Sequence, residues 1–166
     1  DLILTTENDT PPEAEHLATQ RLVWVGAPGG SAWRQRPLRL AFERGCLFRP
    51  WALEALDAAD IPWEMAVDTG STRTVEATVS ADLAIHAMLD CAIGSMYEAI
   101  NHGGALPELP SSRINMYRAR GAQGEPISAL ADMVRDAYRG LPAAAIRLAD
   151  ESAADRVGAQ RAGAAA

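Results

Sequence analysis

The middle of the chain, residues 61–90, changes its hydrophobic period twice and constrains the fold more than any other stretch. Segment 64–68 alternates polar and apolar side chains, which is typical of a half-buried strand. Segment 75–79 repeats apolar side chains at helical spacing, and 83–89 then indicates a second strand. The sequence therefore predicts a strand–helix–strand unit with a polar turn, 69–72, at the carboxyl end of its first strand. Ligands bind at such ends in open α/β sheets.

The rest of the chain also alternates strand and helix patterns, which favours an α/β fold with a largely parallel sheet. The further strands are expected at residues 2–4, 17–26, 46–49 and 113–118. The further helices are expected at residues 51–59, 91–100 and 127–138. Segment 37–44 has only a short amphipathic pattern. The alanine-rich end, 153–166, predicts a ragged helix or disorder.

Composition narrows the classes of function. The chain has 166 residues, of which 48% are hydrophobic, enough for one ordinary domain or two small lobes. Its net charge of −7 argues against binding nucleic-acid phosphates by itself. No apolar run approaches the roughly 18 residues of a membrane helix, and no signal peptide is visible, so we expect a cytoplasmic protein without a membrane partner. Because the chain starts inside a strand pattern at Asp1, further sequence is expected upstream.

Catalytic and metal-binding patterns are not evident in the sequence. Cys46 and Cys91 form no C-x-x-C pair and have no metal-ligand spacing, which predicts two reduced, buried thiols. His16 and His102 are expected at the surface and His86 in the core or a cleft, since none has the spacing of a zinc ligand. The acidic residues are scattered and there is no G-x-S-x-G elbow. We expect no catalytic residue, no metal ligand and no cofactor, and therefore no enzyme.

The polar turn of the central unit is a better candidate for a binding site. Thr69, Gly70, Ser71 and Thr72 lie where a strand meets the N-terminus of a helix. The free N–H groups and the positive end of the helix dipole favour an anionic or polar ligand there. The alternative is that Thr69 or Ser71 only caps the helix, and both interpretations can hold at once.

Two other strand ends carry polar residues. Phe48 and Arg49 precede a helix that begins near Pro50, and Arg49 can pair with a ligand carboxylate. The alternative is an exposed arginine beside a helix-start proline. Thr5 and Thr6 end the first expected strand. Together the three ends predict one rim of a cleft, with these candidate binding residues: Thr5, Thr6, Phe48, Arg49, Thr69, Ser71 and Thr72.

The order of these segments, from about Asp1 to Arg139, resembles the effector-binding domain of LysR-type transcriptional regulators. The first strand, D-L-I-L-T-T, is similar to the family's L-D-L-A-I strand before the crossover between lobes. The L-V-W-V run at 22–25 is similar to the strand that enters the second lobe. Residues 71–85 resemble the family stretch S-x-x-x-x-x-x-x-V-x-A-G-L-G-I-A. The D-I-P-W segment at 60–63, with the following S-T, most resembles the branch of HexA, LrhA and PecT.

The sequence departs from the family pattern in the same region. Asp82 and Ala84 stand where the family usually has two glycines, and Leu89 stands near its usual proline. A differently shaped loop is therefore expected there.

The resemblance implies a type 2 periplasmic-binding-protein-like fold with two lobes, the first of them incomplete in this chain. The implied divisions are the end of lobe I with the crossover at 1–16, lobe II at 17–108, the return to lobe I at 109–139, and a partly disordered tail at 140–166. It further implies a small-molecule effector in the interlobe cleft and a homo-oligomer, either a dimer or a tetramer. DNA would be bound only through an N-terminal winged helix-turn-helix that is missing here.

Three alternatives stay open. A solute-binding protein of the same architecture would carry a signal peptide before Asp1. A small α/β enzyme would lose its activity on Ser95→Ala or His86→Ala. A domain with an empty cleft would mainly assemble oligomers.

Overall fold

The computed structural model describes residues 1–119 and 124–140. The strands are β1 (Leu2–Glu7), β2 (Glu15–Gly26), β3 (Leu38–Glu43), β4 (Trp63–Thr69), β5 (His86–Leu89), β6 (Glu98–Ala99) and β7 (Ser111–Arg118). The helices are α1 (Arg49–Ala58), α2 (Thr72–Ser80) and α3 (Glu125–Arg139), with short 3-10 turns η1 (Ala32–Arg34) and η2 (Asp90–Ala92). The expected disorder at 153–166 lies outside the described residues.

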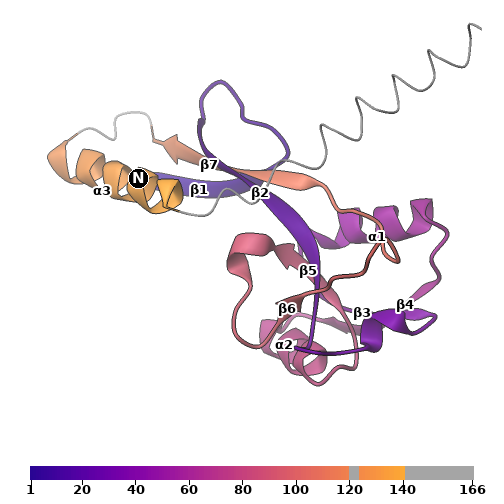
Figure 1. The fold of residues 1–166 in the computed structure, drawn as a ribbon. Coiled ribbons are helices and arrows are strands. Elements are labelled where there is room, and N and C mark those ends of the chain that lie inside the picture. The colour runs from indigo at the N-terminus through magenta and orange to yellow at the C-terminus, as the bar shows by residue number, and fades with distance from the viewer. Residues whose placement is uncertain (120–123, 141–166) are drawn as a thin grey trace, which may run out of the picture.

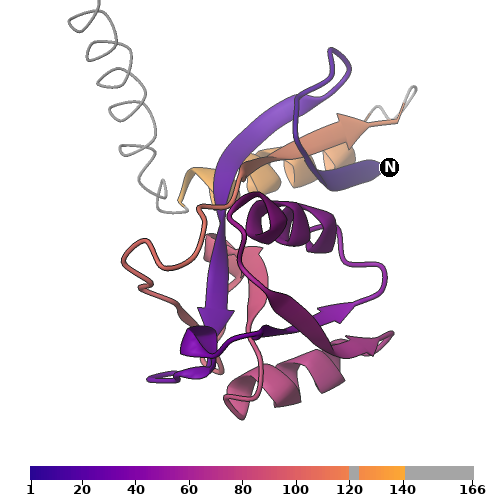
Figure 2. The same cartoon turned by 90° about the vertical axis from the view of Figure 1, so that its right-hand side faces the viewer.

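Strand β2 belongs to both halves of the molecule (Figures 1 and 2). Its first part, Glu15–Arg21, pairs antiparallel with β7, and β1 pairs with the far edge of β7. Its last part, Leu22–Val25, pairs antiparallel with β5, and β6 adds a short pairing at its end. Helix α3 lies along the β1–β7–β2 sheet. One strand therefore takes part in the sheets of both halves, and the main hydrophobic cluster includes Ile114 of β7 beside Leu40 and Leu56.

The second half continues from β5 to two parallel strands. Strands β3 and β4 pair in parallel. A parallel bridge joins Leu40 of β3 to Ile85, just before β5. The Ile85 N–H donates to the Arg39 carbonyl at 2.9 Å, and the Ala41 N–H donates to the Ile85 carbonyl at 3.0 Å. These bonds extend the hydrogen-bonded surface from β4 through β3 to β5 and β2.

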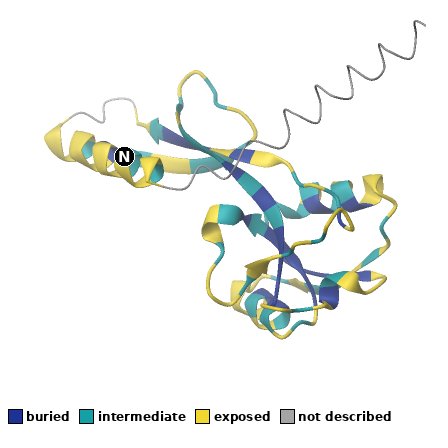
Figure 3. Ribbon diagram, in the orientation of Figure 1, coloured by how far each residue is buried: buried dark blue, intermediate teal, exposed yellow. Residues whose placement is uncertain are grey.

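The two faces of β3 are covered by different helices, because successive side chains of a strand point to opposite faces. Leu40 and Phe42 lie fully buried in one cluster, which also contains Leu56 of α1. Ala41 lies in a second cluster with Val75 of α2. Figure 2 shows α1 and α2 on opposite sides of these strands, and Figure 3 shows the buried residues gathered in this half. Each large side chain buried here contributes about 1.5–3 kcal/mol through the hydrophobic effect.

The central strand–helix–strand unit is confirmed as β4, α2 and β5, with the second strand shorter than expected. The strand begins at His86 because Asp82 adopts the left-handed backbone conformation, with φ 56°, and turns the chain. The predictions for the segments that form β1, β2, β7 and α3 are also confirmed, each with bounds that differ by some residues.

Two element predictions are wrong. The strand expected at 46–49 is a turn, and α1 already begins at Arg49; the strand is β3, within the segment that showed only an amphipathic pattern. The alternating Leu38, Leu40 and Phe42 are fully buried, whereas Gly45 lies in the turn that follows. The helix expected at 91–100 is replaced by η2 and β6, since Gly94 interrupts the pattern and β6 pairs with the end of β2.

The expectation of a largely parallel sheet is also wrong for most pairings. Among the described strands, β3 with β4 and the Leu40–Ile85 bridge are parallel, and the other pairs are antiparallel. These antiparallel pairings arise because β2 runs antiparallel to both β5 and β7. No helix within the described ranges has the length and apolar character needed to cross a bilayer.

Candidate functional site

The ends of β3 and β4 bring five of the seven predicted residues to one edge, which we call the rim: Phe48, Arg49, Thr69, Ser71 and Thr72. The first two open α1, Thr69 ends β4, and the last two open α2. The Arg44 N–H donates to the Thr69 carbonyl at 2.9 Å, which ties the turn after β3 to the end of β4.

Arg49 already has a carboxylate partner within the chain. Its two terminal nitrogens each lie 3.3 Å from an oxygen of Asp68, and Arg44 lies 3.4 Å from the same carboxylate. Hydrogen bonding from the Arg49 guanidinium lowers the pKa of Asp68 below its ordinary value. An anionic ligand at Arg49 would therefore have to share this guanidinium with Asp68 or displace it.

The N-terminus of α2 keeps unpaired capacity for an anion. Ser71 occupies the capping position, but its hydroxyl makes no capping hydrogen bond. Instead the Ser71 N–H donates to the Thr69 hydroxyl at 3.1 Å, so Thr69 shapes the turn before the helix. Ser71, Thr72 and Arg73 are exposed. Because the positive end of the helix dipole faces solvent here, a small anion or polar group can bind.

Thr5 and Thr6 lie in the other half of the molecule. In β1 they pair with Asn115 and Ile114 of β7. The Thr5 hydroxyl is buried and has no hydrogen-bond partner among the described residues. Within the described chain neither threonine makes a hydrogen bond to a rim residue, so the structure does not bring these two groups into direct contact.

A polar network beside Thr5 was not found from the sequence. Asn115 is fully buried, and its amide donates to Glu7 at 2.5 Å and to the Asp9 carbonyl at 2.7 Å. The Tyr117 hydroxyl donates to the same Glu7 carboxylate at 2.9 Å. The bond from Asn115, with that from Tyr117, lowers the pKa of Glu7. No local pattern reveals this network, because β7 lies far from β1 in the sequence.

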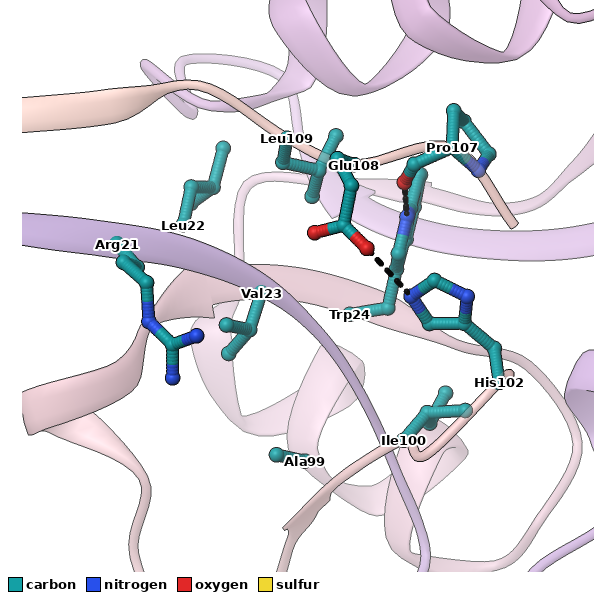
Figure 4. Close-up of a pocket in the computed structure, with 10 residues that line it drawn as sticks. All are labelled: Arg21, Leu22, Val23, Trp24, Ala99, Ile100, His102, Pro107, Glu108 and Leu109. Carbon is teal, nitrogen blue, oxygen red and sulfur yellow. Dashed lines mark hydrogen bonds and ion pairs between the residues drawn. The ribbon is translucent and has the colours of Figure 1, made fainter. Parts of the chain in front are cut away.

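A cavity of about 190 Å³ lies beside β2 where the chain passes between the halves; its lining residues are drawn in Figure 4, and we call it the crossover pocket. Residues 21–24 of β2 form one wall, and residues in 99–109 form the other. The Trp24 indole N–H donates to the Pro107 carbonyl at 2.9 Å, and the Leu22 N–H donates to the Pro110 carbonyl at 3.2 Å. The two chain segments that run between the halves, β2 and residues 107–110, therefore meet at this pocket.

The crossover pocket contains polar groups with unused capacity. Arg21 donates to Asp90 at 2.9 Å, yet its Nε is buried and has no partner among the described residues. His102 was expected at the surface, which is wrong, because its side chain is only 14% exposed. Its Nδ1 accepts from the Leu106 N–H at 3.3 Å, and its Nε2 lies 3.9 Å from Glu108.

A second cavity, of about 220 Å³, lies against the glycine-containing loop after β2, residues 26–30. Asp82 holds this loop: its carboxylate accepts from the N–H groups of Ser31 and Ala32 at 2.9 Å each. A side chain at Gly30 would place its Cβ 2.5 Å from the Asp82 carboxylate. Asp82, which stands where the family usually has a glycine, adopts the left-handed conformation and uses its side chain to fix the loop.

The LysR substrate binding domain model matches residues 1–139, so the chain belongs to this family. The structure is similar to the regulatory domain of CcmR from Synechocystis PCC6803 in complex with 2-PG, with a TM-score of 0.55 and 14% identity over 84% of this chain and 75% of that one. It is also similar to the bromide-bound regulatory domain of HypT from Salmonella typhimurium, with a TM-score of 0.64 and 14% identity over 85% and 73%.

The effector-binding domain of QuiR in complex with shikimate is similar with a TM-score of 0.53 and 18% identity over 81% of this chain and 69% of that one. Against full-length HypT, the chain spans 53% of the length. No curated protein matches the sequence. The expected type 2 periplasmic-binding-protein-like α/β fold is confirmed. Full-length HypT is described as a hypochlorite-specific LysR-type transcriptional regulator.

The contact of Asp82 with the loop should stabilise the protein in a pH-dependent way. Burial alone would raise its pKa, but the hydrogen bonds from Ser31 and Ala32 more than offset this, and the pKa is lowered. Asp82→Asn should cost about 1 kcal/mol in the free energy of unfolding near pH 7, since a charged acceptor is lost. Because the pKa of Asp82 is lower in the folded than in the unfolded protein, its ionised carboxylate stabilises the fold fully above the unfolded pKa of about 4. This stabilisation is lost as the pH falls through the folded pKa. Urea unfolding should show that the free energies of unfolding of the wild-type and Asp82→Asn proteins converge as the pH falls from 7 through the folded pKa.

Asp60→Asn is the matched control. Asp60 is also left-handed, with φ 53°, but it is exposed and its carboxylate has no hydrogen-bond partner within the described chain. It should change the stability by less than about 0.5 kcal/mol. Equal losses in the two variants, or a loss in Asp82→Asn that is independent of pH, would contradict this role for Asp82.

Proposed function

We propose that this chain is the effector-sensing and oligomerisation domain of a bacterial LysR-type transcriptional regulator that acts in the cytoplasm. A small polar or anionic molecule would bind between its two halves and control transcription. DNA would be contacted through a winged helix-turn-helix elsewhere in the full-length protein, and no catalytic residue is invoked. The observation that carries the proposal is the family match over residues 1–139.

The geometry supports a polar or anionic effector. The exposed N-terminus of α2 offers N–H donors, and Arg49 stands beside it on the rim. The opposite wall would come from the half that contains Thr5 and Thr6, whose buried Thr5 hydroxyl has no partner among the described residues. The similar CcmR and QuiR domains were solved with small molecules, 2-PG and shikimate.

The connections between the halves suggest how binding would be transmitted. We propose residues 1–16 and 109–139 as parts of lobe I and residues 17–108 as lobe II, with 140–166 as a tail. β2 and the return segment at 107–110 connect these lobes at the crossover pocket. A ligand held by both lobes would favour one relative orientation, and it can shift the population only by its difference in affinity for the two states.

The β1–α3 half supports the oligomer. Its exposed apolar side chains are Ile3 at 57% and Leu4 at 46% on β1, and Leu130 at 49% and Met133 at 68% on α3. Exposed apolar groups gathered on one part of a molecule are typical of protein–protein contacts. We propose that the α3 face with Leu130 and Met133 contributes to a homodimer or homotetramer. The assignment to the HexA, LrhA and PecT branch stays a prediction that rests on the D-I-P-W segment.

Effector binding is tested by isothermal titration calorimetry of the full-length regulator against a panel of small organic acids. At least one should bind, and Ser71→Ala combined with Thr72→Val should weaken it roughly tenfold, because about 1.4 kcal/mol of hydrogen bonding is lost. Ser80→Ala, at the other end of α2, should leave the affinity unchanged. The absence of any binder, or an equal affinity in all variants, would contradict the proposal.

The assembly surface is tested by light scattering at several concentrations. Met133→Glu should shift the full-length protein toward a smaller mass, because a charge would be buried in the contact. Met96→Glu is the control, since Met96 is also exposed, at 48%, but lies between η2 and β6. An unchanged mass of the Met133→Glu protein would show that α3 takes no part in the contact between subunits.

A further inference from the structure

We propose that Glu43, Cys46 and His86 form a binding site for zinc or a chemically similar divalent transition-metal ion. One ligand atom from each side chain lies within 4.8 Å of the other two. Thiolate, imidazole and carboxylate are the three ligand types that zinc uses in proteins. The inference concerns a different group of atoms from the effector site and does not rest on the proposed function.

His86 is already oriented as a metal-binding histidine. It is buried at the start of β5, and its Nδ1 lies 2.8 Å from the Ala41 carbonyl, to which it must donate a proton. The lone pair of the neutral ring is therefore on Nε2. The Phe42 ring packs against it, with centroids 4.5 Å apart, and fixes the ring plane. A backbone carbonyl that holds the far nitrogen is the usual outer partner of a ligating histidine.

Glu43 is the last residue of β3, and Cys46 lies in the turn between β3 and α1. The Cys46 N–H donates to the Glu43 carbonyl at 3.1 Å, which places both side chains at the end of β3, beside the start of β5. Both residues are only partly buried. Ligand atoms on a tetrahedral zinc ion lie about 3.5 Å apart. Rotation of the Glu43 and Cys46 side chains can bring their ligand atoms from separations of up to 4.8 Å to this distance, while His86 stays fixed.

The charge balance of the three residues also fits a divalent cation. One thiolate and one carboxylate neutralise two positive charges, and the imidazole adds none. The nearby cation, Arg49, is held by Asp68 and is not required for this balance. Three protein ligands leave a fourth position for water. The ordinary alternative is a packed neutral histidine beside a reduced thiol, with no affinity for metal.

Binding would join the β3–α1 turn to β5. Because the same turn leads into Phe48 and Arg49, a bound ion would also stiffen one side of the rim. The expected consequence is a rise in the melting temperature when metal is added to the metal-free protein, since the ion binds the folded state preferentially.

Cobalt is the probe for the experiment. The untagged full-length regulator is stripped of metal in a phosphine reductant and titrated with Co²⁺. We expect one ion per chain, with thiolate-to-cobalt charge-transfer absorption and the strong visible bands of a tetrahedral site, both displaced by Zn²⁺. The absence of charge-transfer absorption in the wild-type protein would overturn the proposal.

Variants locate the site. Cys46→Ser should abolish the charge-transfer absorption, whereas Cys91→Ser should retain it, because Cys91 is exposed and lies in η2. Glu43→Gln should weaken Co²⁺ binding at least tenfold while keeping the sulfur-based absorption. Glu43→Gln also keeps the test decisive if Cys46→Ser fails to fold. Absorption that persists in Cys46→Ser, or an unchanged affinity in Glu43→Gln, would overturn the assignment.

Discussion

The continuous strand β2 is the constraint on which the rest of the structure depends. Its 12 residues span roughly 40 Å and satisfy their backbone hydrogen bonds with strands from both halves. Leu22 and Trp24 are each only 2% exposed, so the middle of the strand cannot leave the core without a large loss of buried area. The Trp24 indole also holds the return connection through the Pro107 carbonyl. The two halves are thereby joined through β2 and through the hydrophobic cluster that includes Ile114 of β7.

This arrangement separates rigid from adaptable parts. The core around β3, β5 and α1 is fully buried, whereas the first turn of α2 and the β1–α3 half expose many side chains (Figure 3). The residues proposed to bind ligands lie at the ends of these elements: Arg49 and Ser71 at helix starts, and Glu43 at the end of a strand. A buried scaffold with polar ends can bind different ligands without altering its core.

The sequence predicted the elements whose hydrophobic period is clear. The unit from β4 to β5 was identified because alternation gave way to helical spacing and back. The apolar run at 46–49 was misassigned because a short apolar segment before a proline has the same pattern whether it is a strand or a turn. Strand direction was misjudged because side-chain periodicity is the same in parallel and antiparallel pairs. The antiparallel direction follows from the path of β2 between the halves. No local sequence pattern encodes this path.

The candidate sites divide in the same way. The five rim residues could be proposed together from the sequence because the strand-end and turn residues lie close to the two helix starts. The crossover pocket and the group of Glu43, Cys46 and His86 were missed because their members come from separate strands and loops, brought together only by the pairing of β3, β5 and β2. The spacing rules for cysteine and histidine ligands apply within a motif, and His86 reaches Cys46 only through the parallel bridge at Ile85.

We propose that the effector is held by both halves of the molecule across β2. Hydrogen–deuterium exchange of the full-length regulator, with and without a bound small molecule, tests this most directly. We expect slower exchange both in the peptide that contains Thr5 and Thr6 and in the peptide that contains the first turn of α2. Slower exchange in only one of these peptides, or in neither, would contradict it.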